Sequence, residues 1–234
     1  MSLKLVIAKI IKNLRKNGLR ATLSMAFGSE GMMGLLRRKA KIDAFDQQYG
    51  TDTAGIVPLW KLSLESPNAI FGIKYQASYE QEIRDAVSLL PVDPREYTFV
   101  DFGCGKGRVL LVAANLGFRE VIGVEFAHEL ADIAKKNLAI MRVANAVIVE
   151  GDAANYRLNC DNAVIYFYNP FGEEVMAKVI SNLKEANARN LFVVYVTPNC
   201  ADLLDQSGFL TRLGSPAGQP DIQVWRRSDP ISQV

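Results

Sequence analysis

Short apolar runs alternate with longer amphipathic stretches along most of the chain from residue 97 onward. The runs are rich in Val, Ile, Phe and Tyr, which favour strands, whereas the stretches repeat apolar residues at the spacing of a helix. This alternation predicts a parallel sheet with helices on both faces. The predicted strands are 97–102, 120–125, 146–150, 163–168 and 191–196, and the predicted helices are 106–116, 127–142 and 173–187.

The pattern changes at both ends of this region. Apolar runs at 209–213 and 222–226 flank a stretch rich in Gly and Pro, which predicts a hairpin. Upstream, residues 80–90 have helical periodicity, and Ser78 is the predicted N-cap. Residues 45–56 are polar and rich in turn-forming residues, with too little apolar periodicity for a strand. We expect this segment to be a lid over a ligand or a linker packed on the core.

The length and composition allow one domain with a substantial core and an appendage, since 49% of the 234 residues are hydrophobic. The pattern divides the chain into a basic amphipathic segment (1–41), a lid or linker with a leading helix (42–96) and the α/β core (97–234). Few and unpaired cysteines indicate a reducing compartment, and no apolar run reaches the length of a membrane span. These features predict a cytoplasmic protein.

The basic residues are concentrated at the start of the chain. Residues 1–41 hold ten Lys and Arg against one acid, a net charge of +9, which leaves −7 for the rest from 17 bases and 24 acids. Apolar residues share one helical face there, as in Leu3, Ile7 and Ile10. Such a helix can cap the domain with solvated lysines, or equally bind an anionic membrane surface or a partner. Nucleic acid is less expected, because no aromatic residues are interleaved to stack on bases.

A glycine-rich loop follows the strand at 97–102. Asp101 precedes three alternating glycines, Gly103, Gly105 and Gly107. Glycines at these positions bring bare backbone to a ligand beside the start of a helix, at the strand end where α/β sheets bind ligands. The dinucleotide fingerprint would need glycine at Arg108, and a P-loop would need Ser or Thr at position 107. The loop therefore fits neither of those nucleotide sites.

An acid followed by G-x-G-x-G resembles the first motif of the class I S-adenosylmethionine-dependent methyltransferases. This resemblance implies S-adenosylmethionine as the cofactor and a doubly wound, Rossmann-like α/β fold. Its sheet would be seven-stranded and mostly parallel, with the antiparallel pair as its C-terminal hairpin. The strand at 120–125 ends on Glu125, placed about 20 residues past the glycines, where a carboxylate can accept both ribose hydroxyls. The alternative is an acid that stabilises a helix start.

The resemblance also implies roles for residues at other strand ends. Asp152 would accept a hydrogen bond from the exocyclic amine of the adenine, and the backbone N–H of Ala153 would face a ring nitrogen. Tyr75 and Ser78, in the loop before the helix at 80–90, would contact the methionine end of the cofactor. Capping and core packing explain these last two residues equally well.

The strand at 163–168 leads into Asn169, Pro170 and Phe171. This segment resembles the Asn/Asp-Pro-Pro-Tyr/Phe motif that many methyltransferases acting on amine nitrogens carry at the same strand end. The resemblance implies that Asn169 accepts hydrogen bonds from the target N–H groups, that Pro170 fixes the loop, and that Phe171 packs against the acceptor. This chain has one proline rather than two, and the alternative is a plain turn. Together with the Tyr-Gly-Thr-Asp-Thr-Ala-Gly run at 49–55, Tyr-Asn-Pro-Phe-Gly resembles a bacterial group of this class.

The leading hypothesis is thus a methyltransferase that acts on an amine nitrogen, with a protein side chain favoured over other macromolecules. The alternatives are a small-molecule O-methyltransferase and a cofactor-binding module without catalysis. Methyl transfer from a sulfonium needs positioning more than acid–base help. The one histidine, His128, is accordingly expected on the surface. No metal site is expected, because Cys104, Cys160 and Cys200 lack the spacing of ligands.

Overall fold

The computed structural model describes residues 44–57, 62, 75–215, 219 and 221–228. The basic segment 1–41 lies outside these residues, so the expectations for it stay as they are. Within the described part of the chain, no helix has both the length and the apolar character needed to cross a bilayer.

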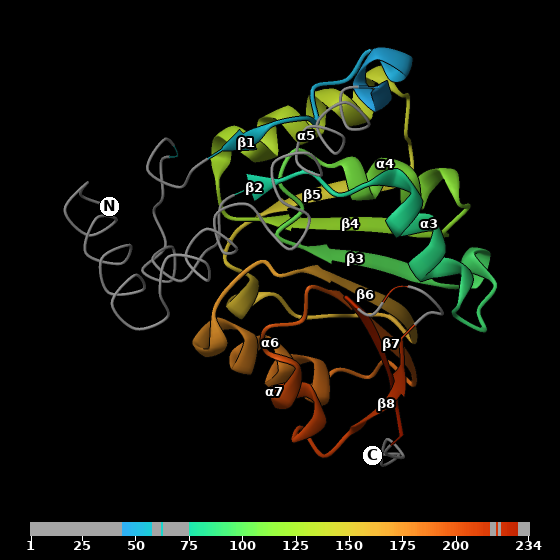
Figure 1. The fold of residues 1–234 in the computed structure, drawn as a ribbon, viewed down its shortest axis with the longest axis vertical. Helices are drawn as coiled ribbons and strands as arrows, with labels where there is room; N and C mark the ends of the chain where they lie inside the picture. The colour runs from blue at the N-terminus through green and yellow to red at the C-terminus, as the bar shows by residue number, and fades with distance from the viewer. Residues whose placement is uncertain (1–43, 58–61, 63–74, 216–218, 220, 229–234) are drawn as a thin grey trace.

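A seven-stranded sheet forms the centre of the molecule, in the order β5-β4-β3-β6-β7-β9-β8 (Figure 1). The pairs from β5 to β7 are parallel, and β9 is antiparallel to both β7 and β8. The predicted fold class is confirmed. The strands are β3 (Thr98–Phe102), β4 (Glu120–Glu125), β5 (Ala146–Glu150), β6 (Asn162–Tyr168), β7 (Asn190–Val196), β8 (Leu210–Gly214) and β9 (Ile222–Arg227).

Helices cover both faces of this sheet (Figure 1). One face packs under α3, α4 and α5, with Ile83 and Leu110 in its core, and the other packs under α6 and α7, with Met176 and Leu204. The central β3 is buried along its whole length, which explains its unbroken apolar sequence. The helices are α3 (Glu80–Ser88), α4 (Arg108–Asn115), α5 (His128–Ile140), α6 (Glu173–Glu185) and α7 (Ala201–Asp205), with 3-10 turns η3 (Pro94–Glu96) and η4 (Ala153–Asn155).

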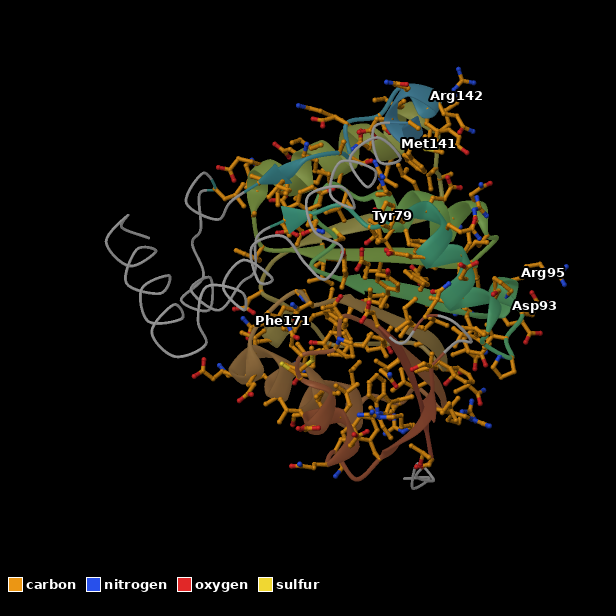
Figure 2. All side chains as sticks on the ribbon, viewed as in Figure 1. Tyr79, Asp93, Arg95, Met141, Arg142 and Phe171 are labelled. Atoms are coloured by element: carbon orange, nitrogen blue, oxygen red, sulfur yellow. The ribbon has the colours of Figure 1, made fainter. Side chains whose placement is uncertain are left out.

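Two helix starts differ from the prediction. The N-cap of α3 is Tyr79, not Ser78, and the Tyr79 N–H donates to the Glu82 carboxylate at 3.3 Å (Figure 2). Helix α4 begins at Arg108, because Gly107 is its N-cap with a left-handed φ of 86°. The glycine loop therefore extends two residues further than the periodicity indicated.

The segment upstream of the sheet also differs from the expectation. Residues 44–49 are helical, and Ile56–Val57 form a short strand, β1, although no strand was expected over residues 45–56. β1 is antiparallel to β2 (Tyr75–Gln76). Each of these strands is only two residues long, which is too short to show an alternating pattern. Their pairing joins residues far apart in the sequence, so local periodicity could not predict it.

Candidate cofactor and acceptor site

The strand order changes direction between β3 and β6, since β4 and β5 lie to one side of β3, and β6 and β7 to the other. Ligands of α/β sheets bind at this switch point, beyond the carboxyl ends of the strands. The glycine loop 103–107 leaves β3 there, and Asn169 to Phe171 leave β6 beside it. A Cβ added at Gly103 would lie 2.8 Å from Cβ of Pro170. The structure thus brings the two predicted motifs into direct contact.

Gly105 lies against the ring of Tyr75. Its φ is +53°, and a Cβ on it would overlap the ring carbons Cδ2 and Cε2. The Tyr75 hydroxyl donates to the Thr53 carbonyl at 2.5 Å, and burial raises the pKa of this tyrosine well above its usual range. Tyr75 is therefore held over the glycine loop, where the resemblance placed the methionine end of the cofactor.

Glu125 ties the end of β4 to the glycine loop. One carboxylate oxygen accepts the Gly105 N–H at 2.8 Å and the other accepts the Ala127 N–H at 2.9 Å. Burial raises the pKa of Glu125, although these N–H groups act in the opposite direction. The carboxylate therefore has a structural role that the sequence did not reveal. The predicted contact of Glu125 with the ribose hydroxyls stays a prediction.

Asp101 and Cys104 lie beneath this loop. Burial, and then the nearby Glu125, raise the pKa of Asp101 well above its usual range, and the same two causes raise that of the Cys104 thiol. Gly123 on β4 leaves room for the Cys104 side chain, since a Cβ there would lie 2.6 Å from its sulfur. Cys104 accordingly packs in the core.

The loop after β5 carries the residues predicted to bind adenine. The Asp152 carboxylate accepts the Ala154 N–H at 2.8 Å and so caps η4, while Ala153 is buried. Asn182 of α6 is also buried and donates to the carbonyls of Ala154 and Tyr156, at 2.8 and 3.3 Å. The loop is therefore fastened to α6 by a side chain that the sequence analysis missed.

A buried arginine holds the upstream segment against the glycine loop. Arg108 is 2% exposed, and its guanidinium lies 2.7 Å from the Thr53 hydroxyl, 3.4 Å from the Ser78 carbonyl and 3.5 Å from the Asp46 carboxylate. Its carbon Cζ lies 4.6 Å from the centroid of the Phe45 ring. Ser78 thus contributes its carbonyl here. The signal for this cluster was Arg108 itself, a charged residue where the dinucleotide motif has glycine.

Asp46 fixes the conformation of residues 51–54 within the same upstream segment. Its carboxylate accepts the N–H groups of Thr53 and Ala54 and the hydroxyls of Thr51 and Thr53, at 2.6–3.0 Å. These hydrogen bonds hold the pKa of Asp46 below its usual value, although partial burial acts in the opposite direction. The polar turn-rich segment is therefore a folded loop packed beside the glycine loop.

Asn169 follows β6 in a left-handed conformation, with φ of 41°. Its Oδ1 is buried and has no hydrogen-bond partner among the described residues. The neighbouring β7 ends the same way, because Thr197, next to the register partner of Tyr168, has φ of 52°. Left-handed backbone costs energy for residues other than glycine and is concentrated at functional sites.

Phe171 lies in the hydrophobic core next to the start of α6. Its ring is buried in the same core as residues of α6 and packs edge-on against Phe167, with ring centroids 6.1 Å apart. These contacts give Phe171 a packing role, and its predicted contact with the acceptor stays a prediction. Asn169, Pro170 and Phe171 remain the candidate acceptor residues.

His128 lies on the surface, as expected. Its Nδ1 is 2.8 Å from Glu150, and its Nε2 is 3.3 Å from Asp132. The Glu150 carboxylate, followed by Asp132, raises the pKa of His128. These three side chains are close enough to share a cation, but the Lys135 ammonium already pairs with both Glu150 and Asp132. A positive charge of the protein is thus in place at this cluster.

Comparison with known proteins agrees with the motifs. Residues 99–189 match the model of a family described as a methyltransferase domain. The match supports a class I S-adenosylmethionine-dependent methyltransferase.

Three solved structures show the same fold. An S-adenosyl-L-methionine-dependent methyltransferase, so described, from Methanococcus maripaludis has a TM-score of 0.53 at 15% identity, covering 66% of this chain and 87% of that chain. A predicted N6-adenine-specific DNA methylase from Listeria monocytogenes has a TM-score of 0.52 at 14% identity, covering 66% and 52%. The glycopeptide N-methyltransferase MtfA, in complex with S-adenosyl-L-methionine, has a TM-score of 0.50 at 13% identity, covering 64% and 94%.

The residues at the switch point fit the cofactor that these findings support, S-adenosylmethionine. The glycine loop follows β3 at its carboxyl end, Glu125 ends the next strand, and the ring of Tyr75 lies over Gly105. The names of the structural neighbours include a DNA methylase and a glycopeptide N-methyltransferase, so the shared fold does not define the acceptor.

Proposed function

We propose that the protein transfers a methyl group from S-adenosylmethionine to an amine nitrogen of a protein side chain or another macromolecule. The observation that carries this proposal is the buried Oδ1 of Asn169, which has no partner among the described residues. A buried acceptor left without a donor costs about 1–3 kcal/mol. An incoming N–H group removes that cost, so the site selects an acceptor that donates a hydrogen bond here.

The position of Asn169 supports a role in transfer rather than in a plain turn. Pro170 packs directly on Gly103, so Asn169 lies beside the glycine loop that we expect to bind the cofactor.

The chemistry requires little beyond positioning. The sulfonium supplies an activated methyl group, so the protein has to bind the amine, exclude water and align the nitrogen lone pair. If Asn169 accepts one N–H of a neutral amine, the lone pair is left directed away from that hydrogen bond, toward the methyl group. An alcohol can donate only one hydrogen to the same oxygen and then has to lose it, which favours an amine over the small-molecule O-methyl alternative.

The decisive experiment is methyl-label transfer from S-adenosylmethionine into a lysate of a strain lacking the protein, followed by mass spectrometry of the labelled species. Asn169→Ala should lower the rate of labelling about 100-fold, the scale of losing one positioned polar contact. Its affinity for S-adenosylhomocysteine should stay within twofold of wild type. The matched control is Asn162→Ala at the opposite end of β6, which should label at the wild-type rate.

Three results would contradict the proposal in different ways. A methyl group found on oxygen or carbon would exclude an amine acceptor. Full labelling by Asn169→Ala would show that Asn169 forms a plain turn and has no role in transfer. No labelling by wild type, with cofactor binding intact, would favour the non-catalytic binding module.

A further inference from the structure

Lys106 is the one charged residue of the glycine loop 103–107, and its side chain is only 10% exposed. The ammonium donates to the Asp52 carboxylate at 2.6 Å and to the Ala54 carbonyl at 3.1 Å. A lysine this deeply buried has lost most of its hydration, so its charge has to be met by partners. The two described partners use two of its three N–H donors.

The other half of this ion pair is open to solvent. The Asp52 side chain is 67% exposed, and its Oδ2 has no partner among the described residues. The pair therefore offers a fixed positive group with one remaining donor and, beside it, an accessible negative group. An ordinary surface ion pair has two mobile exposed ends, and a buried one has none.

Asn137 of α5 sets the spacing of the two residues. Its Oδ1 accepts the Asp52 N–H, and its Nδ2 donates to the carbonyls of both Asp52 and Lys106, each at 2.9 Å. Asn137 is buried. The two backbones that carry the charges are thus joined through a single side chain, so the charges are positioned before any ligand arrives.

The ion pair lies beside Tyr75, whose ring packs on the glycine loop. The Lys106 ammonium is 5.9 Å from the centroid of the Tyr75 ring, and that ring covers Gly105. The Tyr75 hydroxyl in turn donates to the carbonyl of Thr53, which is the residue after Asp52. The pair and the glycine loop therefore belong to one site.

The backbone of the loop has little left to offer an anionic group. The N–H groups of Gly103 and Cys104 donate to the Val124 carbonyl, that of Gly107 to the Cys104 carbonyl, and that of Gly105 to Glu125. Four of the five amides of loop 103–107 are thus used within the protein. A carboxylate that approaches the loop finds its positive charge on the Lys106 side chain.

We propose that Lys106 and Asp52 recognise the amino-acid end of the cofactor, with Lys106 binding the α-carboxylate and Asp52 binding the α-ammonium group. A zwitterion beside a fixed pair of opposite charges gains two charge-assisted hydrogen bonds in one orientation only. The inference rests on S-adenosylmethionine as the cofactor and is independent of the nature of the acceptor.

The test is calorimetry on the full chain with two probes. S-adenosylhomocysteine carries both amino-acid groups, whereas 5′-deoxy-5′-methylthioadenosine keeps the nucleoside and the thioether and lacks both. In Asp52→Asn and in Lys106→Met, affinity for S-adenosylhomocysteine should fall at least tenfold, while affinity for methylthioadenosine should stay within twofold. Lys135→Met, which removes an exposed lysine ion pair on α5, is the control and should change neither affinity.

Asp52→Asn keeps the test decisive if Lys106→Met fails to fold, because the Asp52 side chain is largely exposed. Equal losses for both probes would mean that the pair only holds the loop together, and unchanged affinities for both would mean that it does not touch the ligand. Either result overturns the inference. Failure of the wild type to bind either probe would overturn the cofactor itself and is thus distinguishable.

Discussion

The carboxyl ends of β3 and β6 are neighbours in the sheet and differ in how their polar groups are satisfied. After β3, the amide of Gly105 has Glu125 as its partner, and Arg108 has Thr53 and Asp46. After β6, the buried oxygen of Asn169 has no partner among the described residues. The groups named at the first end are thus paired within the protein, whereas the Asn169 oxygen at the second end can accept a hydrogen bond from a ligand.

We propose that this difference corresponds to two tasks, cofactor binding after β3 and alignment of the acceptor after β6. A cofactor of constant shape is served by a loop fixed in advance, because less ordering is then needed on binding. An acceptor has to be aligned during transfer, and contacts reserved for that moment raise the rate more than contacts made beforehand. We therefore expect substitutions after β3 to affect stability and cofactor affinity together, and those after β6 to affect turnover alone.

Gly105→Ala should have the largest effect. The added Cβ meets the ring of Tyr75 in a left-handed backbone, so we expect a loss of about 2–4 kcal/mol in the free energy of unfolding. Binding of S-adenosylhomocysteine should fall at least 100-fold. Denaturant titration and calorimetry measure the two effects.

Gly117→Ala is the control for backbone strain. Gly117 has φ of +87° with open space around it, so alanine there should cost about 1 kcal/mol and leave binding unchanged. Equal behaviour of the two variants would show that the contact between Gly105 and Tyr75 has no importance for the site.

Glu125→Gln should have an intermediate effect. The amide group of glutamine places a donor where the carboxylate accepts the Gly105 or the Ala127 N–H, so one buried N–H loses its partner at a cost of about 1–3 kcal/mol. Affinity for S-adenosylhomocysteine should fall at least tenfold as well. From the sequence alone one would expect affinity to fall with stability unchanged, so thermal unfolding separates the two accounts.

Glu150→Gln is matched to this change, because Glu150 is the register partner of Glu125 on β5 and is more exposed. We expect it to cost less than about 1 kcal/mol. A cost similar to that of Glu125→Gln would contradict the role of Glu125 in holding the loop.

Asn169→Gly should have the smallest effect on stability. Glycine relieves the left-handed strain at φ of 41°, and its greater freedom in the unfolded chain offsets part of that gain. The free energy of unfolding should therefore change by less than about 1 kcal/mol, while methyl-label transfer falls as in Asn169→Ala. Arg142→Gly, at φ of 52° after α5, removes similar strain and should leave transfer unchanged (Figure 2). A stability loss above 2 kcal/mol for Asn169→Gly alone would end the contrast between the two strand ends.

The sheet and its cofactor could be predicted from the sequence because their signals are local. The alternation of strands and helices gave the strand ranges to within a residue or two, and the spacing of Gly103, Gly105 and Gly107 pointed to S-adenosylmethionine. Both predictions are confirmed. The roles of single residues toward the ligand stay predictions.

The contacts that complete the site could not be predicted, because they join residues far apart in the sequence. Asp46 and Arg108 are 62 residues apart, and Asp52 and Asn137 are 85 apart. Neither contact produces a repeating pattern of apolar and polar residues in the sequence. The packing of Phe171 against Phe167 was not predicted either, because the motif indicated only a contact with the acceptor.

Arg108 has a consequence for how this domain can be divided. The region that matches the methyltransferase-domain family begins at residue 99, yet Thr53 and Asp46, which bind the Arg108 guanidinium, lie well before it. A fragment that started at the first strand of the sheet would retain every strand from β3 to β9 and leave a cation in an apolar interior. The part of this protein that can fold independently is therefore larger than the part that matches the family. A chimera that includes the glycine loop also has to include the upstream segment with Asp46 and Thr53.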